Sequence, residues 1–326
     1  MDKRRLGNTD IFVTPVGMGV LTVGRTQLNL SVEAGSQIVC HALERGINFL
    51  DTAEFYETYP YIKRALDNLA SSFSSGALHR PVIVSKSLSL DYNGMRAAIE
   101  DCRKALNMDQ IDIFLLHEVR EVPDFKNRSG AWECLNDAKA KGLVKAVGLS
   151  THHICVVNEA YTTPGIDVIF PLINYESLGI RKGSDTGTCD EMAHAIMAAA
   201  ENGIGIFTMK AFGGGNLLKD YKKALDYVTS LSGITSTMIG MGCKKDVDDA
   251  IAYFENRLPQ NYAPDVTNKH MFVDRGDCES CGACVSRCTS KAIHLDNEGI
   301  ALIDYTKCVL CGYCAPVCPS RALIML

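Results

Sequence analysis

Apolar and polar positions alternate in a regular way along the first 258 residues of the chain. Short apolar runs, which predict strands, are separated by longer stretches in which apolar residues recur at helical spacing. The clearest helical stretches are residues 33–45, 95–106, 131–141, 191–201 and 217–231. The predicted strands are residues 14–19, 48–51, 82–85, 111–116, 144–149, 167–173, 205–209 and 236–241.

Eight strands that alternate with helices favour a closed (β/α)8 barrel, an α/β fold in which parallel strands close without an exposed edge. Residues 6–13 place Gly7 and Asn8 between short polar and apolar pieces, which predicts a small hairpin before the first barrel strand. We expect this hairpin to plug one end of the barrel. The barrel domain is predicted to cover residues 1–258.

Titratable side chains stand at or just after the ends of three predicted strands. Asp51 and Tyr56 follow the second strand, Lys86 the third, and His117 the fourth. The loops at the carboxyl ends of barrel strands meet at one mouth. Each residue alone is more often structural, as a helix cap, a rim residue or a satisfied core histidine. Together they predict an active site, in which Asp51 is the counter-charge of a buried Lys86.

A family resemblance rests on these same positions. The combination that resembles the catalytic tetrad of the aldo-keto reductases is Asp51-Thr52-Ala53 with Tyr56, then Lys86, then Leu115-Leu116-His117. The resemblance covers residues 1 to about 258 and includes the opening run 5–9 and the run 147–150. It implies an oxidoreductase that interconverts a carbonyl and an alcohol with a nicotinamide cofactor, NADP or NAD.

The resemblance also implies a role for each residue. Tyr56 would donate or accept a proton, and Lys86 would lower the pKa of its phenol. Asp51 would hold Lys86 in place, and His117 would orient the substrate oxygen. The implied cofactor contacts are Gly19, Val20, Ser150, Asn174, Lys210, Phe212 and Gly240.

Two positions depart from the pattern of the family. Glu57 follows the tyrosine where a glycine is usual, and Gly242 stands where an arginine would meet the 2′-phosphate of NADP. The choice between NADP and NAD therefore stays open, although Lys244 or Lys245 could supply a point charge. The glycines at 213–215 would let backbone approach a pyrophosphate, or they form a flexible loop. No GxGxxG motif opens a helix, which argues against a Rossmann fold.

The last part of the chain has a different character. Helical periodicity stops near residue 255, and residues 259–269 predict a linker rich in proline and asparagine. Eight of the 14 cysteines fall between residues 278 and 318, in two C-x2-C-x2-C-x3-C runs that lie thirty residues apart. Residues 272–274 and 302–304 match around these runs, as do 292–293 and 322–323. Residues 270–326 are therefore an internal duplication.

This segment resembles the bacterial two-cluster ferredoxins, which implies a small α+β domain with two [4Fe–4S] clusters. In that family the fourth cysteine of each run ligates the other cluster. The implied ligand sets are Cys278, Cys281, Cys284 and Cys318 for one cluster, and Cys308, Cys311, Cys314 and Cys288 for the second. Zinc is the alternative, but zinc sites typically use Cys-x2-Cys pairs separated by longer loops.

Composition and charge argue against several classes of function. A formal net charge of −5 offers no basic footprint for nucleic acid, and no run of about 18 apolar residues predicts a membrane span. The basic N-terminal residues are not followed by the apolar segment of a signal peptide. We therefore expect a cytoplasmic protein, in which crowded cysteines bind metal rather than form disulfides.

Three functions are consistent with this organisation. The leading one is an oxidoreductase that acts on a small-molecule carbonyl or alcohol and is fused to an electron-transfer module. In the second, the barrel binds a dinucleotide without turnover and serves as a docking or redox-sensing module. In the third, the clusters only brace the fold. Hydride carries two electrons and a cluster accepts one, so a flavin or a flavoprotein partner is predicted between nicotinamide and clusters.

Overall fold

The computed structural model describes residues 1–266, 269–308 and 312–325. The barrel strands are β3 (Val16–Gly19), β4 (Phe49–Asp51), β5 (Val82–Ser87), β6 (Ile111–Leu116), β7 (Val144–Thr151), β8 (Val168–Pro171), β11 (Gly205–Thr208) and β12 (Ile234–Gly240). They form a closed parallel barrel in the order β11-β12-β3-β4-β5-β6-β7-β8. The structure contains all eight predicted strands, and the predicted fold class is confirmed.

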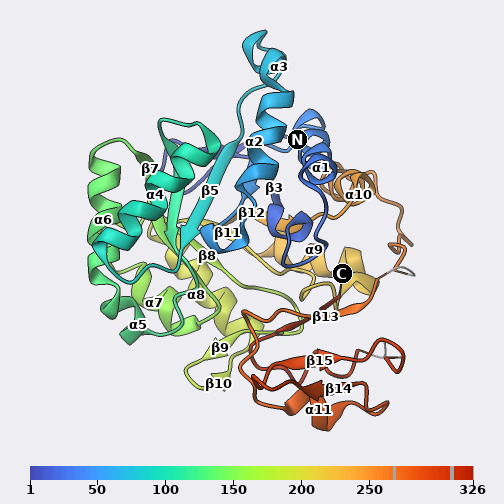
Figure 1. The fold of residues 1–326 in the computed structure, drawn as a ribbon. Helices are drawn as coiled ribbons and strands as arrows, with labels where there is room; N and C mark the ends of the chain where they lie inside the picture. The colour runs from blue at the N-terminus through green and yellow to red at the C-terminus, as the bar shows by residue number, and fades with distance from the viewer. Residues whose placement is uncertain (267–268, 309–311, 326) are drawn as a thin grey trace.

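Helices surround the barrel (Figure 1). Three of these helices have a side-chain N-cap. In each, the cap residue, Ser31, Asp91 or Thr188, accepts a hydrogen bond from a backbone N–H in the first turn. The predicted helix 217–231 is divided into η3 (Leu218–Asp220) and α9 (Tyr221–Ser230). The other helices are α1 (Val32–Glu44), α2 (Tyr59–Asn68), α3 (Ala70–Ser74), α4 (Tyr92–Leu106), α5 (Val122–Asn127), α6 (Ser129–Ala140), α7 (Ile154–Ala160), α8 (Cys189–Glu201) and α10 (Lys244–Phe254).

Short elements occupy the connections between these helices and strands. Two 3-10 helices follow the first two barrel strands, η1 (Val20–Val23) after β3 and η2 (Glu54–Tyr56) after β4. The connection between β8 and α8 contains a two-stranded sheet, β9 (Arg181–Lys182) and β10 (Asp185–Thr186). The turn η2 therefore places Tyr56 close to the carboxyl end of β4.

The predicted N-terminal hairpin is formed by β1 (Arg4–Arg5) and β2 (Phe12–Val13), which pair antiparallel. Leu6, Ile11 and Val13 are buried in the same apolar cluster as Phe49 and Phe207 of the barrel interior. The hairpin therefore plugs the barrel as expected. The plug lies at the amino ends of the strands and leaves their carboxyl ends for the cavity described below.

The C-terminal segment folds as a small α+β unit. Strand β13 (Met271–Val273) pairs with β16 (Leu323–Met325), and β14 (Ile293–Leu295) pairs with β15 (Ala301–Ile303). The helix α11 (Ala283–Arg287) follows the first cysteines. The small core of this unit contains residues of all four strands and of the cysteine runs.

Hydrogen bonds repeat between the two halves of this unit at an offset of thirty residues. The backbone N–H of Asp274 donates to the Ala322 carbonyl, and that of Asp304 donates to the Ala292 carbonyl, both at 2.7 Å. In the same way, the N–H groups of Ala292 and Ala322 donate to the sulfurs of Cys288 and Cys318, at 3.2 and 3.3 Å. The structure thus contains the duplication that the sequence pattern predicts.

The small unit lies against one end of the barrel, below it in Figure 1. Its last strand contacts the glycine run after β11, because the Met325 N–H donates to the Gly214 carbonyl at 2.7 Å. The side-chain amide of Asn216 donates to the Leu323 carbonyl at 2.9 Å. An ion pair of 3.0 Å joins Lys210 of the barrel to Asp277, the residue before Cys278. These contacts hold the small unit over the carboxyl ends of the barrel strands.

The predicted linker, residues 259–269, lies between α10 and β13, and its residues 267 and 268 are outside the described part of the chain. The domain limits at 258 and 270 stay predictions. Among the described residues, no helix combines the length and apolar character that a bilayer crossing requires.

Candidate active site and iron–sulfur ligands

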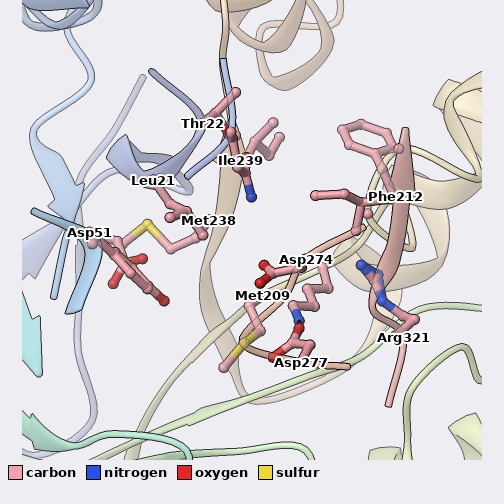
Figure 2. A pocket seen from close by; sticks show the side chains of 18 of the residues that line it. Leu21, Thr22, Asp51, Met209, Phe212, Met238, Ile239, Asp274, Asp277 and Arg321 are labelled. Carbon is pink, nitrogen blue, oxygen red and sulfur yellow. Dashed lines mark hydrogen bonds and ion pairs between the residues drawn. The ribbon is translucent and has the colours of Figure 1, made fainter. Parts of the chain in front are cut away.

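A cavity of about 560 Å³ opens at the carboxyl ends of the barrel strands. Such a volume is typical of small-molecule and cofactor sites. Its walls come from both parts of the chain, since Asp51 and Met238 of the barrel face the same space as Asp274, Asp277 and Arg321 of the C-terminal unit (Figure 2). Side chains separated by more than 200 residues in the sequence therefore enclose one site.

A buried ion pair lies at the bottom of this cavity. Lys86 is 1% exposed, and its Nζ lies 2.9 Å from a carboxylate oxygen of Asp51, the last residue of β4. The same ammonium donates to the Thr52 carbonyl at 2.7 Å. Burial raises the pKa of Asp51 and lowers the pKa of Lys86, and the opposite charge of each partner opposes both shifts. The carboxylate of Asp51 compensates the ammonium charge of Lys86, which would be costly to bury in the barrel without a partner.

Tyr56 and His117 lie next to this pair. The ammonium of Lys86 lies 4.3 Å from the centroid of the Tyr56 ring. The Tyr56 hydroxyl lies 3.2 Å from Nε2 of His117, and the two rings meet edge to face. Burial lowers the pKa of His117 well below its usual value, with the charge of Lys86 as the next cause. The imidazole is therefore neutral at neutral pH, and one of the two groups donates a hydrogen bond to the other. The structure thus brings together all four predicted tetrad residues.

The charges around Tyr56 differ from the sequence-based expectation that Lys86 lowers its pKa. Burial raises the pKa of Tyr56 well above its usual value, and the carboxylates of Asp51, Asp277 and Asp274 raise it further. Lys86 lies over the ring and is paired with Asp51, and the carboxylate of that pair is itself one of the causes that raise the pKa of Tyr56. The phenol is accordingly protonated at neutral pH.

Glu57, one of the two departures from the family pattern, has a backbone conformation that is usual for glycine. Its φ of 55° lies in the left-handed region, where a glycine has no steric penalty and other residues lose about 1–2 kcal/mol. The backbone after Tyr56 therefore takes the conformation that suits a glycine, although a glutamate stands there. Arg25 lies 3.4 Å from its carboxylate at the surface.

The predicted cofactor contacts divide into two groups. Two of the seven, Val20 and Asn174, do not line the cavity and are fully buried. The amide of Asn174 is bound to the backbone of Leu178 through both its oxygen and its nitrogen. The cavity is lined by the other five, Gly19, Ser150, Lys210, Phe212 and Gly240.

Three charged residues of the C-terminal unit, Asp274, Asp277 and Arg321, line the cavity and were not predicted. Asp277 directly precedes Cys278, and Arg321 follows Cys318 by three residues. Their chemistry is visible in the sequence, but their distance along the chain from the barrel gives no sign that they reach its cavity. The docking of the C-terminal unit, with β16 against Gly214 and Asp277 paired with Lys210, brings them there.

Comparison with known proteins agrees with this geometry. The model of the Aldo/keto reductase family matches residues 15–230. The chain belongs to this family. A second model, the 4Fe-4S dicluster domain, matches residues 277–322. The chain is therefore an aldo/keto reductase barrel fused to an iron–sulfur domain, as the two resemblances implied.

Curated relatives match only part of the chain. Methylglyoxal reductase DkgA of Escherichia coli O157:H7 is 28% identical over 169 residues, which cover 50% of this chain and 56% of that protein. A D-threo-aldose 1-dehydrogenase of a Pseudomonas species is 24% identical over 237 residues, 65% of this chain and 69% of that protein. The chain thus spans little more than half the length of the first of these two relatives.

Solved structures share the fold of the aldo/keto reductase barrel. The holo form of an aldo-keto reductase from Bacillus halodurans has a TM-score of 0.62 at 18% identity, and the match covers 81% of this chain and 98% of the other. The Bombyx mori aldo-keto reductase in complex with NADP has a TM-score of 0.58 at 18% identity, with coverages of 78% and 88%. At these identities the likeness supports the fold alone.

The cysteines of the dicluster domain are arranged in two groups. One small cavity is lined by Cys278, Cys281, Cys284 and Cys318, the four residues of the first predicted ligand set. Of the second set, Cys288, Cys308 and Cys314 pack in the small core of the domain, and Cys311 lies outside the described residues. The fourth cysteine of the second run thus shares a space with the first run, as a crossed assignment requires.

The donor set of the first cavity suits a cluster. Within residues 1–266, 269–308 and 312–325, no three Cys, His, Asp or Glu side chains converge on a point where they could hold a single metal ion. The four cysteines line one small cavity. In a [4Fe–4S] cube each thiolate binds a different iron atom, so four sulfurs around a space fit a cube better than one zinc ion.

We predict that cysteine variants will group according to the crossed assignment. Cys288→Ser should remove the same electron paramagnetic resonance signal as Cys308→Ser, because both residues would ligate the second cluster. Cys318→Ser should remove the same signal as Cys284→Ser. Iron content and spectra of the reduced variants measure this. If Cys288→Ser instead matches Cys284→Ser, the crossed assignment is wrong.

Proposed function

We propose that the barrel interconverts a carbonyl and an alcohol with NADP or NAD, and that the C-terminal domain holds two [4Fe–4S] clusters for electron transfer. The observation that carries the catalytic part is the buried Lys86–Asp51 pair next to the Tyr56–His117 contact, at the end of a cavity of cofactor size. The ligand cysteines must stay reduced to bind iron, so we also propose a cytoplasmic location.

The bound dinucleotide supplies the hydride. Tyr56 supplies the proton to the substrate oxygen, and its raised pKa keeps it in the protonated form that a donor needs. Lys86, fixed by Asp51, stabilises the phenolate that remains after proton transfer. Neutral His117 positions the same oxygen through its ring nitrogen. Asp51, Lys86 and His117, which surround the Tyr56 side chain, are themselves buried.

The far end of the cavity bears on the choice of dinucleotide. The family resemblance places the 2′-phosphate of NADP after β12, where this chain has Gly242. There the Gly242 N–H donates to Asp246, and Lys245 is paired with Asp249 at 2.6 Å. Carboxylates thus already bind two of the polar groups, the Gly242 N–H and the Lys245 ammonium, that could contact a 2′-phosphate. Our proposal therefore covers NAD as well as NADP.

The relation between the two redox centres follows from electron count. Hydride moves two electrons together, whereas a [4Fe–4S] cluster ordinarily accepts one. We therefore propose that a flavoprotein partner connects nicotinamide oxidation to the clusters. The small-molecule substrate is a carbonyl or an alcohol, the class on which the named relatives of the family act.

We predict that Tyr56→Phe lowers kcat for carbonyl reduction by about 10²- to 10⁴-fold, the range for loss of a positioned proton donor. The Kd for cofactor should stay nearly unchanged, because the phenol acts on the transition state. Lys86→Met should cause a similar loss and move any residual tyrosine-dependent alcohol oxidation to higher pH, because the phenolate loses its cation. Steady-state kinetics with a panel of aldehydes and equilibrium binding measure both effects.

Tyr61→Phe is the matched control, since the Tyr61 hydroxyl binds the Leu30 carbonyl and does not line the cavity. Its turnover should equal that of the unmodified protein. Retained turnover in Tyr56→Phe would contradict the proton-donor role. Cofactor binding by the unmodified protein without turnover of any aldehyde or alcohol would favour the docking or redox-sensing function instead.

We predict that NADH or NADPH does not reduce the clusters directly. When anaerobic, cluster-loaded, flavin-free protein is mixed with excess reduced cofactor, the visible absorbance of the clusters should persist until a flavoprotein reductase is added. Dithionite serves as the control that shows the clusters are reducible, which a purely structural role does not require. Bleaching within a few turnovers without flavin would show that the conversion occurs inside this chain.

A further inference from the structure

Arg321 is a buried cation without a hydrogen-bond partner among the described residues. The side chain is 1% exposed, and none of its three guanidinium nitrogens meets an acceptor within the described ranges. Leaving such a charge buried and unpaired is costly. Figure 2 shows the guanidinium of Arg321, which lies shortly before β16, on the same side of the cavity as Phe212 and on the opposite side from Asp51.

The internal duplication provides a comparison for this position. Thirty residues earlier, Lys291 occupies the equivalent place, and both residues have left-handed backbones with φ of 52° and 62°. Lys291 is exposed to solvent, whereas Arg321 is enclosed by the barrel. The fold of the repeat therefore does not require a buried cation here. Burial of Arg321 follows from its place in the cavity.

Nearby carboxylates are engaged elsewhere. Asp277 pairs with Lys210 at 3.0 Å, and Asp274 accepts a hydrogen bond from the Gly276 N–H at 3.1 Å. Both raise the pKa of Arg321, but neither accepts a hydrogen bond from it. The N–H donors of the guanidinium are therefore available to a ligand that enters the cavity.

The backbone beside Arg321 is the glycine run 213–215, against which the C-terminal strand packs. The guanidinium lies against the glycine run 213–215, where a Cβ on Gly214 would lie 1.9 Å from Nη2. Gly214 has a φ of 67°, which also favours glycine. Gly214, Gly215 and Arg321 line the same cavity, so an anionic ligand that enters it can reach the planar donors of the guanidinium. Arginine forms two parallel hydrogen bonds with phosphate oxygens, a geometry that lysine lacks.

We propose that Arg321 binds the pyrophosphate of the nicotinamide dinucleotide in the barrel cavity. This inference rests on the proposed function, and it adds a binding residue that comes from the iron–sulfur domain. A ligand with its nicotinamide near Tyr56 has to extend across the cavity to reach Arg321, as an extended dinucleotide does. Asp277 before Cys278 and Arg321 after Cys318 then link the cofactor site to the chain segments of the first ligand set.

The test is equilibrium binding of NADH and NADPH to anaerobic, cluster-loaded protein, measured by calorimetry. Arg321→Gln should weaken both cofactors by about 10- to 100-fold, the range for losing charge-assisted hydrogen bonds to one phosphate group. Arg321→Lys should recover part of the affinity, because it keeps the charge and loses the fork. Lys291→Gln is the matched control, with the same change of charge at the equivalent exposed position, and should bind like the unmodified protein.

Iron content of each variant shows that the dicluster domain is intact. Unchanged affinity of Arg321→Gln for both cofactors would overturn the inference, and so would a loss confined to NADPH, which would assign Arg321 to the 2′-phosphate. An effect seen only on the KM of substrates that carry a carboxylate would also overturn it. If Arg321→Gln loses its clusters, Arg321→Lys decides: weaker binding supports the inference and equal binding overturns it. Failure of the unmodified protein to bind either dinucleotide would instead remove the proposed function itself.

Discussion

The ion pair between Lys86 and Asp51 is the interaction on which the candidate active site depends. Strands β4 and β5 are neighbours in the barrel, so their carboxyl ends bring the two side chains to 2.9 Å without a special loop. A buried ammonium needs such a partner, since breaking a buried pair by removing one side costs about 3–5 kcal/mol. With Lys86 fixed, the ring of Tyr56 packs over it, and His117 after β6 meets the hydroxyl. Barrel geometry and one electrostatic requirement thus place all four groups.

The iron–sulfur domain forms part of the wall of the cavity in which this pair lies. Its acids change the electrostatics of the tetrad, because Asp277 and Asp274 add to the rise in the Tyr56 pKa. Its last strand covers the glycine run after β11, so the run serves as a docking surface as well as a place for close approach. Two residues that line the cavity, Asp277 and Arg321, lie close in sequence to Cys278 and Cys318, two of the predicted cluster ligands. Residues of the barrel and of the iron–sulfur domain therefore line one cavity.

The sequence predicted the parts of this structure that follow from short-range patterns. Strand periodicity identified the barrel, and the residues at strand ends predicted which four side chains would lie together, because parallel strands align their ends. The repeated cysteine runs predicted the duplication that the paired hydrogen bonds of Asp274 and Asp304 display. The position of Arg321 and Asp277 in the barrel cavity was not predictable, because it depends on how the barrel and the C-terminal unit dock. The burial of Val20 and Asn174 was missed for a similar reason, since side-chain direction depends on packing that a motif does not encode.

A crystal structure of the cluster-loaded protein soaked with a nicotinamide cofactor would test the central claim, that the barrel cavity is a dinucleotide site closed by the iron–sulfur domain. The account predicts an extended dinucleotide with its nicotinamide ring beside Tyr56 and His117, and with its pyrophosphate within hydrogen-bond distance of the Arg321 guanidinium. A cofactor bound outside this cavity, or a nicotinamide ring directed away from Tyr56, would contradict it.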